Sequence, residues 1–562
     1  MKKWNSKPLS LILSAVFVSD FVHADPDPLV QESHRLKHQE VLEASGKALQ
    51  KAETLLQRTS PSKKVSASNI DQHLPIIQKI RIDTANIIDS EELHQVIESY
   101  QGKNLTSAQI FEISQQLTEE LYRHGYVTSA VGLKSVDVLE GDLQFIIHWG
   151  KVDQWLVNKH LPRSFKDKAM LILLPKFKGG VFNIHQLDQM IETLSTSNKS
   201  ATVDVLSSEQ NGKSHLNFNI SRRLLPRIVL GFNMSGIENN ANGRNQGTIS
   251  LRMGDLLGTN DEWNISFGHR FYRQHKHNNQ INYTIGYTQP FSFYRLETKL
   301  SQSHYKKTIN GINGAYGSSG RSQTLTAKLS RLLFRDKVNI LTAYSELEFK
   351  TRTNYLAHRK VLNRQENKFS IGLSYITHLW QGRLYSELSY ANGLNWSGAD
   401  ALAYGSQGNK TLRILNGNVT WHKKLPLLGH ETHYQLRIGG QYSGAHLYSD
   451  NQFSLGDEYT VRGFKGGAIS AESGVYISQT MSLSFYPRKY SISQFTPSIG
   501  IDIGQVYPKG KAATQTIAGV SAGLNTTLYN HLSLSLGYAR PLMNIKQRKN
   551  NSVYYFNGSI SF

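Results

Sequence analysis

Apolar and polar side chains alternate with a period of two from Arg227 to the end of the chain, as in Gln280–Tyr287. Successive side chains of a β-strand point to opposite faces, so each alternating run predicts a strand with one apolar and one polar face. Sixteen such runs can be recognised, with approximate spans 227–235, 245–254, 262–272, 278–288, 292–304, 321–332, 337–351, 365–377, 382–394, 410–423, 431–446, 473–486, 494–507, 515–527, 531–540 and 553–562.

The connections between these runs alternate in length. The short ones lie at 289–291, 334–336, 381–382 and 529–530, and the long ones lie at about 305–320, 352–364, 395–409 and 447–472. Short turns on one side and long loops on the other are typical of transmembrane β-barrels, whereas a soluble β-repeat protein does not predict this asymmetry. We therefore expect residues 224–562 to form a transmembrane β-barrel of about 16 antiparallel strands, with both ends in the periplasm.

The last alternating run has an apolar and a polar face. Tyr554, Phe556, Ile560 and Phe562 lie on the apolar face, and Tyr555 lies on the other. A strand of this kind suits a position between lipid and a wet lumen. The run resembles the terminal strand by which outer-membrane barrels are recognised for insertion, so the barrel-assembly machinery is an expected partner.

The amino-terminal part of the chain follows other patterns. Residues 1–24 combine three lysines, a short apolar segment and a small residue at the end, which predicts a signal peptide. Residues 25–60 carry a thin apolar stripe at helical spacing, so we expect a mostly polar helix in solvent or in a wet cavity. Residues 61–73 are rich in serine and lysine and predict a linker.

Two small α/β units are expected between this linker and the barrel. Residues 74–150 read as strand, helix, helix, strand, strand, with a helix at 106–124 and a strand at 126–133. Residues 151–223 repeat the same order. The predicted fold is therefore an N-terminal helix, two tandem α/β units and a transmembrane barrel.

The amino-acid composition limits the environments and partners that are expected for this protein. The chain has no cysteine, which excludes disulfides and thiolate metal sites. Its formal net charge is +21, and loss of the predicted signal peptide, with three Lys and one Asp, leaves 21 − 2 = +19. An exported protein rarely meets nucleic acid, so the positive charge favours the outer membrane and its lipopolysaccharide phosphates as partners.

No motif for catalysis is present. The sequence contains no Gly-x-Ser-x-Gly, no His-Glu-x-x-His and no phosphate-binding Gly-x-x-x-x-Gly-Lys-Ser/Thr, and its 21 histidines are scattered. We expect no catalytic residues, no metal, no cofactor and no enzyme activity. An outer-membrane hydrolase and a passive porin are the alternatives, but a porin leaves roughly 200 periplasmic residues unexplained, more than one typical domain.

Several motifs resemble outer-membrane transporters of two-partner secretion, the TpsB type, which are relatives of the BamA-like insertases. Residues 100–106 and Gly125-Tyr126-Val127-Thr128-Ser129 are similar to the family's first POTRA (polypeptide-transport-associated) domain, and 174–194 is similar to its second. Residues 256–261 resemble the first periplasmic barrel turn. The resemblance covers essentially the whole mature chain and implies POTRA domains at 74–150 and 151–223, with the 125–129 motif recognising substrate.

The strongest similarity is Val461-Arg462-Gly463-Phe464 in the longest outer loop, 447–472. In the family this loop folds into the lumen, and its Arg pairs with an Asp of a Phe-x-Asp-x-Gly-like strand motif. Asp502 and Gly504 stand at the corresponding positions, although Gly500 replaces the aromatic residue. The resemblance therefore implies a latch between Arg462 and Asp502, a pairing that an Arg fork can make bidentately.

The resemblance also implies a function. The helix at 25–60 would plug the barrel at rest, and the pore would export an unfolded TpsA-type exoprotein, such as a haemolysin, a filamentous adhesin or a contact-dependent toxin, without ATP. The protein is expected to be a monomer. A BamA-like insertase is the alternative, but such insertases usually carry more POTRA units, and the plug-like helix argues against it.

Overall fold

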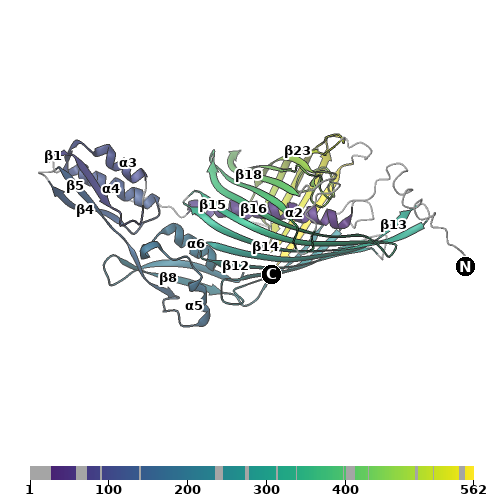
Figure 1. Cartoon of the computed structure of the whole chain (residues 1–562), viewed down its shortest axis with the longest axis horizontal. Coiled ribbons are helices and arrows are strands. Elements are labelled where there is room, and N and C mark those ends of the chain that lie inside the picture. Colours follow the sequence, from purple (N-terminus) through teal and green to yellow (C-terminus); the bar gives the residue numbers. More distant parts are fainter. Residues whose placement is uncertain are drawn as a thin grey trace.

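The computed structural model is a β-barrel with a helix inside it and two α/β units at one end (Figure 1). The residues that it describes are 27–57, 73–88, 91–137, 141–234, 245–271, 278–311, 314–336, 338–396, 398–399, 412–427, 429–487, 492–510, 512–543 and 551–562. The predicted signal peptide, most of the predicted linker and most of the predicted outer loop 395–409 lie outside the described residues.

Sixteen antiparallel strands form the closed barrel. In chain order they are β9 (Arg227–Asn233), β10 (Asn245–Gly254), β11 (Glu262–Phe271), β12 (Asn279–Phe291), β13 (Tyr294–Gly311), β14 (Gly314–Arg335), β15 (Ile340–Leu356), β16 (Arg359–Leu379), β17 (Gly382–Leu394), β18 (Arg413–Leu427), β19 (His430–Tyr442), β22 (Ser473–Ser484), β23 (Ile492–Tyr507), β24 (Gln515–Leu528), β25 (Leu532–Pro541) and β26 (Val553–Ser561). The first and last strands close the barrel, with register from Val229↔Ser561 to Asn233↔Asn557. The predicted strand number and fold class are confirmed.

Two predicted outer loops are wrong. The segments 305–320 and 352–364 were expected to be loops, but β13 pairs with β14 as far as Gly311↔Gly314, and β15 pairs with β16 as far as Leu356↔Arg359. Both hairpins run on as strands because ladder hydrogen bonds need no apolar face once the strands have left the bilayer. Figure 1 shows the hairpin at β13 extending beyond the rest of the barrel.

The first α/β unit packs two helices on a three-stranded sheet. Strands β2 (Lys79–Asp83), β5 (Asp142–His148) and β4 (Ala130–Asp137) lie in the order β2-β5-β4, with β2 parallel to β5. Helices α3 (Glu91–Tyr100) and α4 (Ser107–Arg123) bury Leu93, Ile97, Ile113, Leu117 and Leu121 in the core.

A second small sheet and one shifted boundary complete this unit. Strands β1 (His73–Ile77) and β3 (Lys103–Thr106) form a two-stranded sheet. The strand predicted at 126–133 begins only at Ala130. Its predicted beginning is wrong, because α4 ends in tight turns and the chain becomes extended only after Ser129.

The second α/β unit repeats this arrangement. Its sheet has the order β6-β8-β7, with β6 (Lys151–Val157) parallel to β8 (Lys213–Arg222) and β7 (Lys199–Ser207) antiparallel to it. Helices α5 (Phe165–Ile172) and α6 (Ile184–Leu194) precede β7, and a short 3-10 turn, η1 (Lys178–Gly180), separates them. Ser164 and Asn183 cap the two helices with side-chain oxygens, which fixes where each helix begins.

The N-terminal helix α2 (Pro28–Gln57) runs through the barrel (Figure 1). It lies against β13, β14, β16, β17 and β18. Its apolar residues Leu29, Val30, Ala48 and Leu49 are buried there. The predicted polar helix in a wet cavity is thus present, and the cavity is the lumen of the barrel.

Candidate functional site

The loop between β19 and β22 (443–472) folds back into the barrel and builds a small core there. It contains a hairpin of β20 (Phe453–Leu455) and β21 (Ile469–Ala471). Leu455, Val461 and Phe464 from the loop pack with Val506 and Ile517 of the barrel wall. Because this apolar cluster is buried against the wall, the loop is part of the lumen and not a surface excursion.

Arg462 and Asp502 form the bidentate pair that the resemblance implied. The Arg462 backbone N–H donates to Asp502 Oδ2 at 2.9 Å, its Nε donates to the same oxygen at 2.7 Å, and its terminal nitrogen donates to Oδ1 at 2.6 Å. The same terminal nitrogen reaches the Gln479 carbonyl at 3.0 Å. Asp502 is buried, so removing one partner would leave an uncompensated charge next to the other.

Glycines make room for this pair. A Cβ at Gly500 would overlap the Arg462 guanidinium, and a Cβ at Gly519 would overlap the Arg462 carbonyl oxygen. Gly463 has φ +109° and lies against the backbone of Arg540, so the loop tip also needs glycine. The missing aromatic residue at position 500 therefore has a physical reason, because the guanidinium occupies that space.

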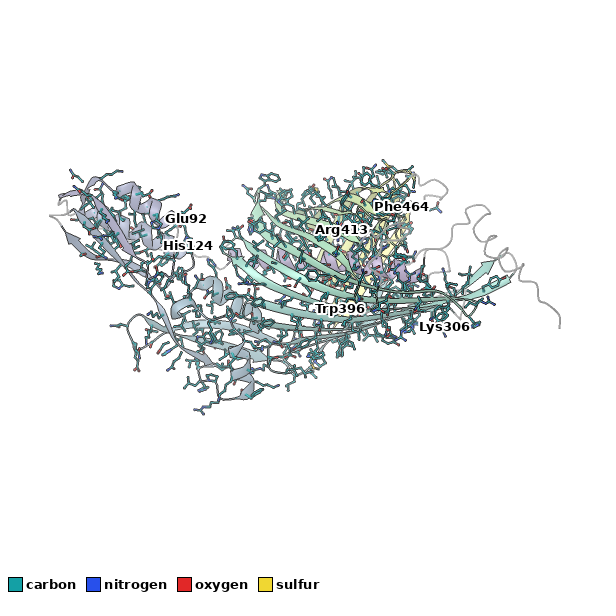
Figure 2. The ribbon with its side chains drawn as sticks, viewed as in Figure 1. Glu92, His124, Lys306, Trp396, Arg413 and Phe464 are labelled. Carbon is teal, nitrogen blue, oxygen red and sulfur yellow. The ribbon has the colours of Figure 1, made fainter. Side chains whose placement is uncertain are left out.

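Tyr555, on the polar face of the last strand, is a second anchor. Its hydroxyl donates to the Phe464 carbonyl at 2.5 Å and accepts from the Gly463 N–H at 3.1 Å. Figure 2 labels Phe464 among the strands of the C-terminal half of the barrel. The loop tip is therefore tied to the last strand as well as to β23.

Arg437 on β19 is a third anchor that the sequence did not reveal. It donates to the Tyr459 carbonyl at 3.0 Å and to the Ser478 hydroxyl at 3.0 Å. Ser478 lies on β22 directly opposite Arg437 in the strand register. The only signal for this anchor in the sequence was a cation at a lumen-facing position.

A fourth group holds the other end of the loop. Asp450 pairs with Lys350 at 2.8 Å and with Arg364 at 2.5 Å. The amide of Asn451 donates to both oxygens of Glu366 at 2.8 Å. These partners lie on β15 and β16, across the barrel from Asp502, so the loop spans the lumen between two charged clusters.

The N-terminal half of α2 is bonded to the wall and to the loop. Glu32 accepts from Arg270 at 3.2 Å and from Asn282 at 3.0 Å, and it pairs with Arg35 on its own helix. His38 lies 2.7 Å from Asp457 of the loop. The helix and the loop therefore hold each other in place, and neither can leave the lumen without breaking charged contacts.

The C-terminal half of α2 meets the second α/β unit. Lys51 pairs with Glu192 of α6 at 2.6 Å, and Arg335 of β14 pairs with the same carboxyl at 2.8 Å. Burial alone would raise the pKa of Glu192, but the charges of Lys51 and Arg335 lower it to about 2. Glu192 thus joins the helix, the second unit and the barrel at one point.

A space of about 530 Å³ remains between α2 and the wall of β13–β17. The wall residues around it are mostly polar. Serines and threonines such as Ser301, Thr324 and Ser370 alternate with about as many charged residues, among them Glu346, Lys350 and Lys368. Such a polar wall suits a hydrated passage.

The 125–129 motif lies at the junction of the two α/β units. The Ile184 N–H donates to the Gly125 carbonyl at 2.9 Å, and the Ser129 hydroxyl accepts from the Gly150 N–H at 3.1 Å. Tyr126 stacks edge-on against Trp149, with ring centroids 5.2 Å apart, and burial raises the pKa of Tyr126. These contacts place the motif at the joint between the two α/β units. Its predicted role in substrate recognition stays a prediction.

A joint of polar contacts connects the second unit to the barrel. Lys199 of β7 donates to Asp255 and to Asn260 of the first periplasmic turn, both at 2.6 Å. Arg222 reaches Asp255 at 3.2 Å. Burial alone would raise the pKa of the Asp255 carboxyl, but the hydrogen bond and charge of Lys199 hold it below its ordinary value.

The residues of the predicted C-terminal signal lie on the outside of the barrel. Tyr554 and Phe562 are exposed, and the ring of Phe556 packs at a tilt against that of Phe232 of the first strand, with ring centroids 5.8 Å apart. The predicted assignment of the two faces agrees with this arrangement. Recognition of the strand by the assembly machinery stays a prediction.

One group of side chains among the described residues has the geometry of a metal site. The candidate ligand atoms of Glu92, Glu120 and His124 lie within 4.8 Å of one another on α3 and the end of α4. Figure 2 labels Glu92 and His124 side by side on the first unit. Arg123 pairs with Glu120 at 3.0 Å and already compensates one of the carboxylates, so the cluster is explained without an ion.

None of the helices that the structure describes is both long and apolar enough to cross a membrane.

Comparisons with known proteins agree with this architecture. A family model described as haemolysin secretion/activation protein ShlB/FhaC/HecB matches residues 212–526, and a ShlB-type POTRA model matches residues 76–150. The outer membrane transporter CdiB of Dickeya dadantii is 25% identical over 405 residues, which are 71% of each chain. The hemolysin transporter protein HpmB of Proteus mirabilis is 24% identical over 505 residues, covering 86% of this chain and 84% of the relative.

A solved structure shows the same fold. CdiB from Escherichia coli superposes with a TM-score of 0.83 at 22% identity, over 96% of this chain and 100% of that chain. At this level of identity the likeness concerns the fold.

Proposed function

The chain belongs to the ShlB/FhaC/HecB family of haemolysin secretion/activation proteins, and from this premise we propose that its pore exports one secreted partner protein and is closed at rest by α2 and the loop 443–472. The chain is an outer-membrane transporter of two-partner secretion, with its POTRA domains in the periplasm. The observation that carries the proposal is α2 in the lumen, bonded to the wall, to the loop and to the second POTRA domain.

The exported partner is a large exoprotein of the TpsA type, captured unfolded in the periplasm. Strands β4 and β7 lie at the edges of the two POTRA sheets and can accept an added strand from an extended chain. Main-chain hydrogen bonds supply affinity in this mode without demanding one sequence. The named relatives include both CdiB and haemolysin transporters, so a haemolysin and a contact-dependent toxin both stay open as the partner.

Transport proceeds without ATP and without enzyme chemistry. The sequence has no phosphate-binding motif for a nucleotide, so folding of the partner outside the cell supplies the driving force. The polar wall of β13–β18 leaves a hydrated passage for an unfolded chain once α2 has left. The insertase alternative is weaker, because a lumen filled by α2 and the loop serves closure of a pore and not lateral insertion.

Planar-bilayer conductance of the purified monomer tests the proposal. We expect a large rise in stable conductance when residues 25–73 are deleted, because the lumen then loses its helix. Glu32→Ala should raise the frequency of opening, since it removes the contacts to Arg270 and Asn282. Lys47→Ala, at an exposed position of the same helix, is the matched control and should leave conductance unchanged.

Two outcomes contradict the proposal. Equal conductance with and without residues 25–73 would mean that α2 does not close the pore. If the deletion opens the pore but a co-expressed partner exoprotein still stays in the periplasm with the intact chain, the chain is not its exporter.

A further inference from the structure

Helix α5 and the segment just before it expose large apolar side chains. Phe165 is 79% exposed and Ile172 is 75% exposed, and Leu161 is also exposed. The inward face of the same helix is ordinary core, with Met170 and Leu171 buried. A helix that buries one apolar face and leaves phenylalanine and isoleucine on the other has a second apolar surface without a partner.

Two further segments of the same region expose leucines. Leu224 and Leu225, in the connection to the first barrel strand, are 95% and 79% exposed. Leu256 and Leu257, in the first periplasmic turn, are exposed as well. Single exposed leucines are normal on protein surfaces, but three neighbouring segments that all present them are not.

Specific contacts hold the three segments together at the rim of the barrel. The Asn260 amide of the turn donates to the Met170 carbonyl of α5 at 3.1 Å. Arg222, next to the connection, reaches Asp167 of α5 at 3.2 Å. The Ser292 N–H of the second periplasmic turn donates to the carbonyl of Leu173 at 2.6 Å. The apolar side chains are thus displayed on one body that is fixed to the barrel.

This body extends outside the barrel wall. Figure 1 shows α5 below the level of β12 and β14, at the barrel end that carries the α/β units. The lipid-facing residues Ile228 and Leu230 of β9 lie within five residues after Leu225 in the chain, and both are exposed. The apolar surface is therefore continuous with the part of the barrel that faces lipid.

We infer that α5 and the leucines of residues 224–225 and 256–257 dock on the phospholipids of the periplasmic leaflet of the outer membrane. Apolar side chains with basic residues between them are the composition of interfacial helices. Arg163, Lys166 and Lys168 are exposed around Phe165 and supply the positive charge.

The bilayer fits this surface better than a protein does. A second chain or an exported polypeptide would have to reach a site beside the barrel wall, where the leaflet already lies. Docking would also fix the second POTRA domain at one angle to the membrane, so that Glu192 of α6 stays opposite the mouth of the lumen. The inference depends on the outer-membrane location and not on the proposed export.

Site-directed spin labelling of the full chain in phospholipid nanodiscs tests this contact. The chain has no cysteine, so Phe165→Cys and Leu224→Cys each give a single label at an exposed position. We expect both labels to be more accessible to oxygen than to a water-soluble nickel chelate, as is Ile249→Cys on the lipid-facing side of β10. Phe111→Cys, at an exposed position of α4, is the aqueous control and should show the reverse.

The inference is overturned if the labels at 165 and 224 behave as the label at 111 does. It is also overturned if they avoid water only when a second labelled copy or a peptide from an exported protein is added, because the partner would then be a polypeptide. Phe165→Glu should shift the label at 224 toward the aqueous pattern, and an unchanged label at 224 would mean that the two sites do not share one docking surface.

Discussion

Two residues of the barrel wall are glycines at the positions where the loop 443–472 touches it. Gly519 on β24 and Gly500 on β23 lie directly under Arg462, and neither position has room for a Cβ. Overpacking a closely fitted contact costs typically 1–3 kcal/mol. At these two positions the choice of glycine is therefore set by the latch and not by the strand.

The two glycines should differ in tolerance. Gly519→Ala should destabilise the barrel by about 1–3 kcal/mol, because its Cβ meets backbone. Gly500→Ala should cost less, because it meets the end of a flexible Arg462 side chain. Gly417→Ala on β18 is the matched control, since its nearest neighbour is at 3.8 Å. Urea unfolding in detergent measures the loss of stability for each of the three variants. Equal losses at all three positions would mean that the loop does not press on the wall.

The energy of the latch can be measured by a double-mutant cycle. Arg462→Ala or Asp502→Ala should each cost about 3–5 kcal/mol, because each leaves a buried charge without its partner. The double variant should cost clearly less than the sum. The pair Lys424–Glu431, 2.7 Å apart and largely exposed, is the control and should show a coupling of about 0–1 kcal/mol. Additive effects for Arg462 and Asp502 would argue against the latch.

At the scale of elements, the turn after helix α4 contacts the start of α6 and so links the two POTRA domains. Gly125 has φ +92°, and its carbonyl accepts the N–H that begins α6. The turn therefore sets how α4 is aligned with α6, and through Glu192 of α6 this alignment bears on α2. A motif that looks like a binding sequence is in this way also a structural joint.

Gly125→Ala tests the joint. Its Cβ would lie 2.6 Å from His185 and 2.8 Å from Asn183, so the junction should open, and secretion should fall. Gly102→Ala is the matched control, because φ is +74° there but nothing lies within 4 Å. Both substitutions carry the penalty of about 1–2 kcal/mol for a left-handed residue. Only Gly125→Ala should broaden the distribution of spin-label distances between the two domains. Lost secretion with an unchanged distribution would instead favour direct substrate recognition by the motif.

At the scale of the whole molecule, one buried carboxylate fixes the second POTRA domain on the barrel. The pKa of Asp255 lies below its ordinary value of 3.8 in the joint. If the joint opens, the carboxyl regains that ordinary value and binds protons more readily. The closed joint is therefore stabilised above pH 3.8, and this stabilisation is lost as the pH falls through the lower pKa of the closed form.

We expect acid to loosen this joint. The distribution of distances between spin labels on β7 and on the barrel should stay narrow from neutral pH down to about 4 and broaden at lower pH. Asp255→Asn is the control, because it has no carboxyl to titrate and should show a distance that does not change with pH in this range. A wild-type distance that stays constant to the lowest pH would contradict a role for Asp255.

The sequence by itself determined the barrel, and its resemblance to a known family implied the latch. Period-two alternation is a local property of every strand, and a lipid outside and water inside impose it along the whole chain, so the strand number and the faces of Tyr554 and Tyr555 could be predicted. The pairing of Arg462 with Asp502 could be expected only because the motif at each position resembles that of the two-partner secretion family.

Only the tertiary structure decided which side chains hold the loop and the helix. Arg437, Tyr555 and Glu192 meet partners that are distant in sequence, and barrel closure and strand register bring them together. The length of the β13–β14 hairpin was equally hidden, because a strand in water needs no apolar face. The position of the 125–129 motif at a joint followed from the packing of two domains, which no single segment encodes.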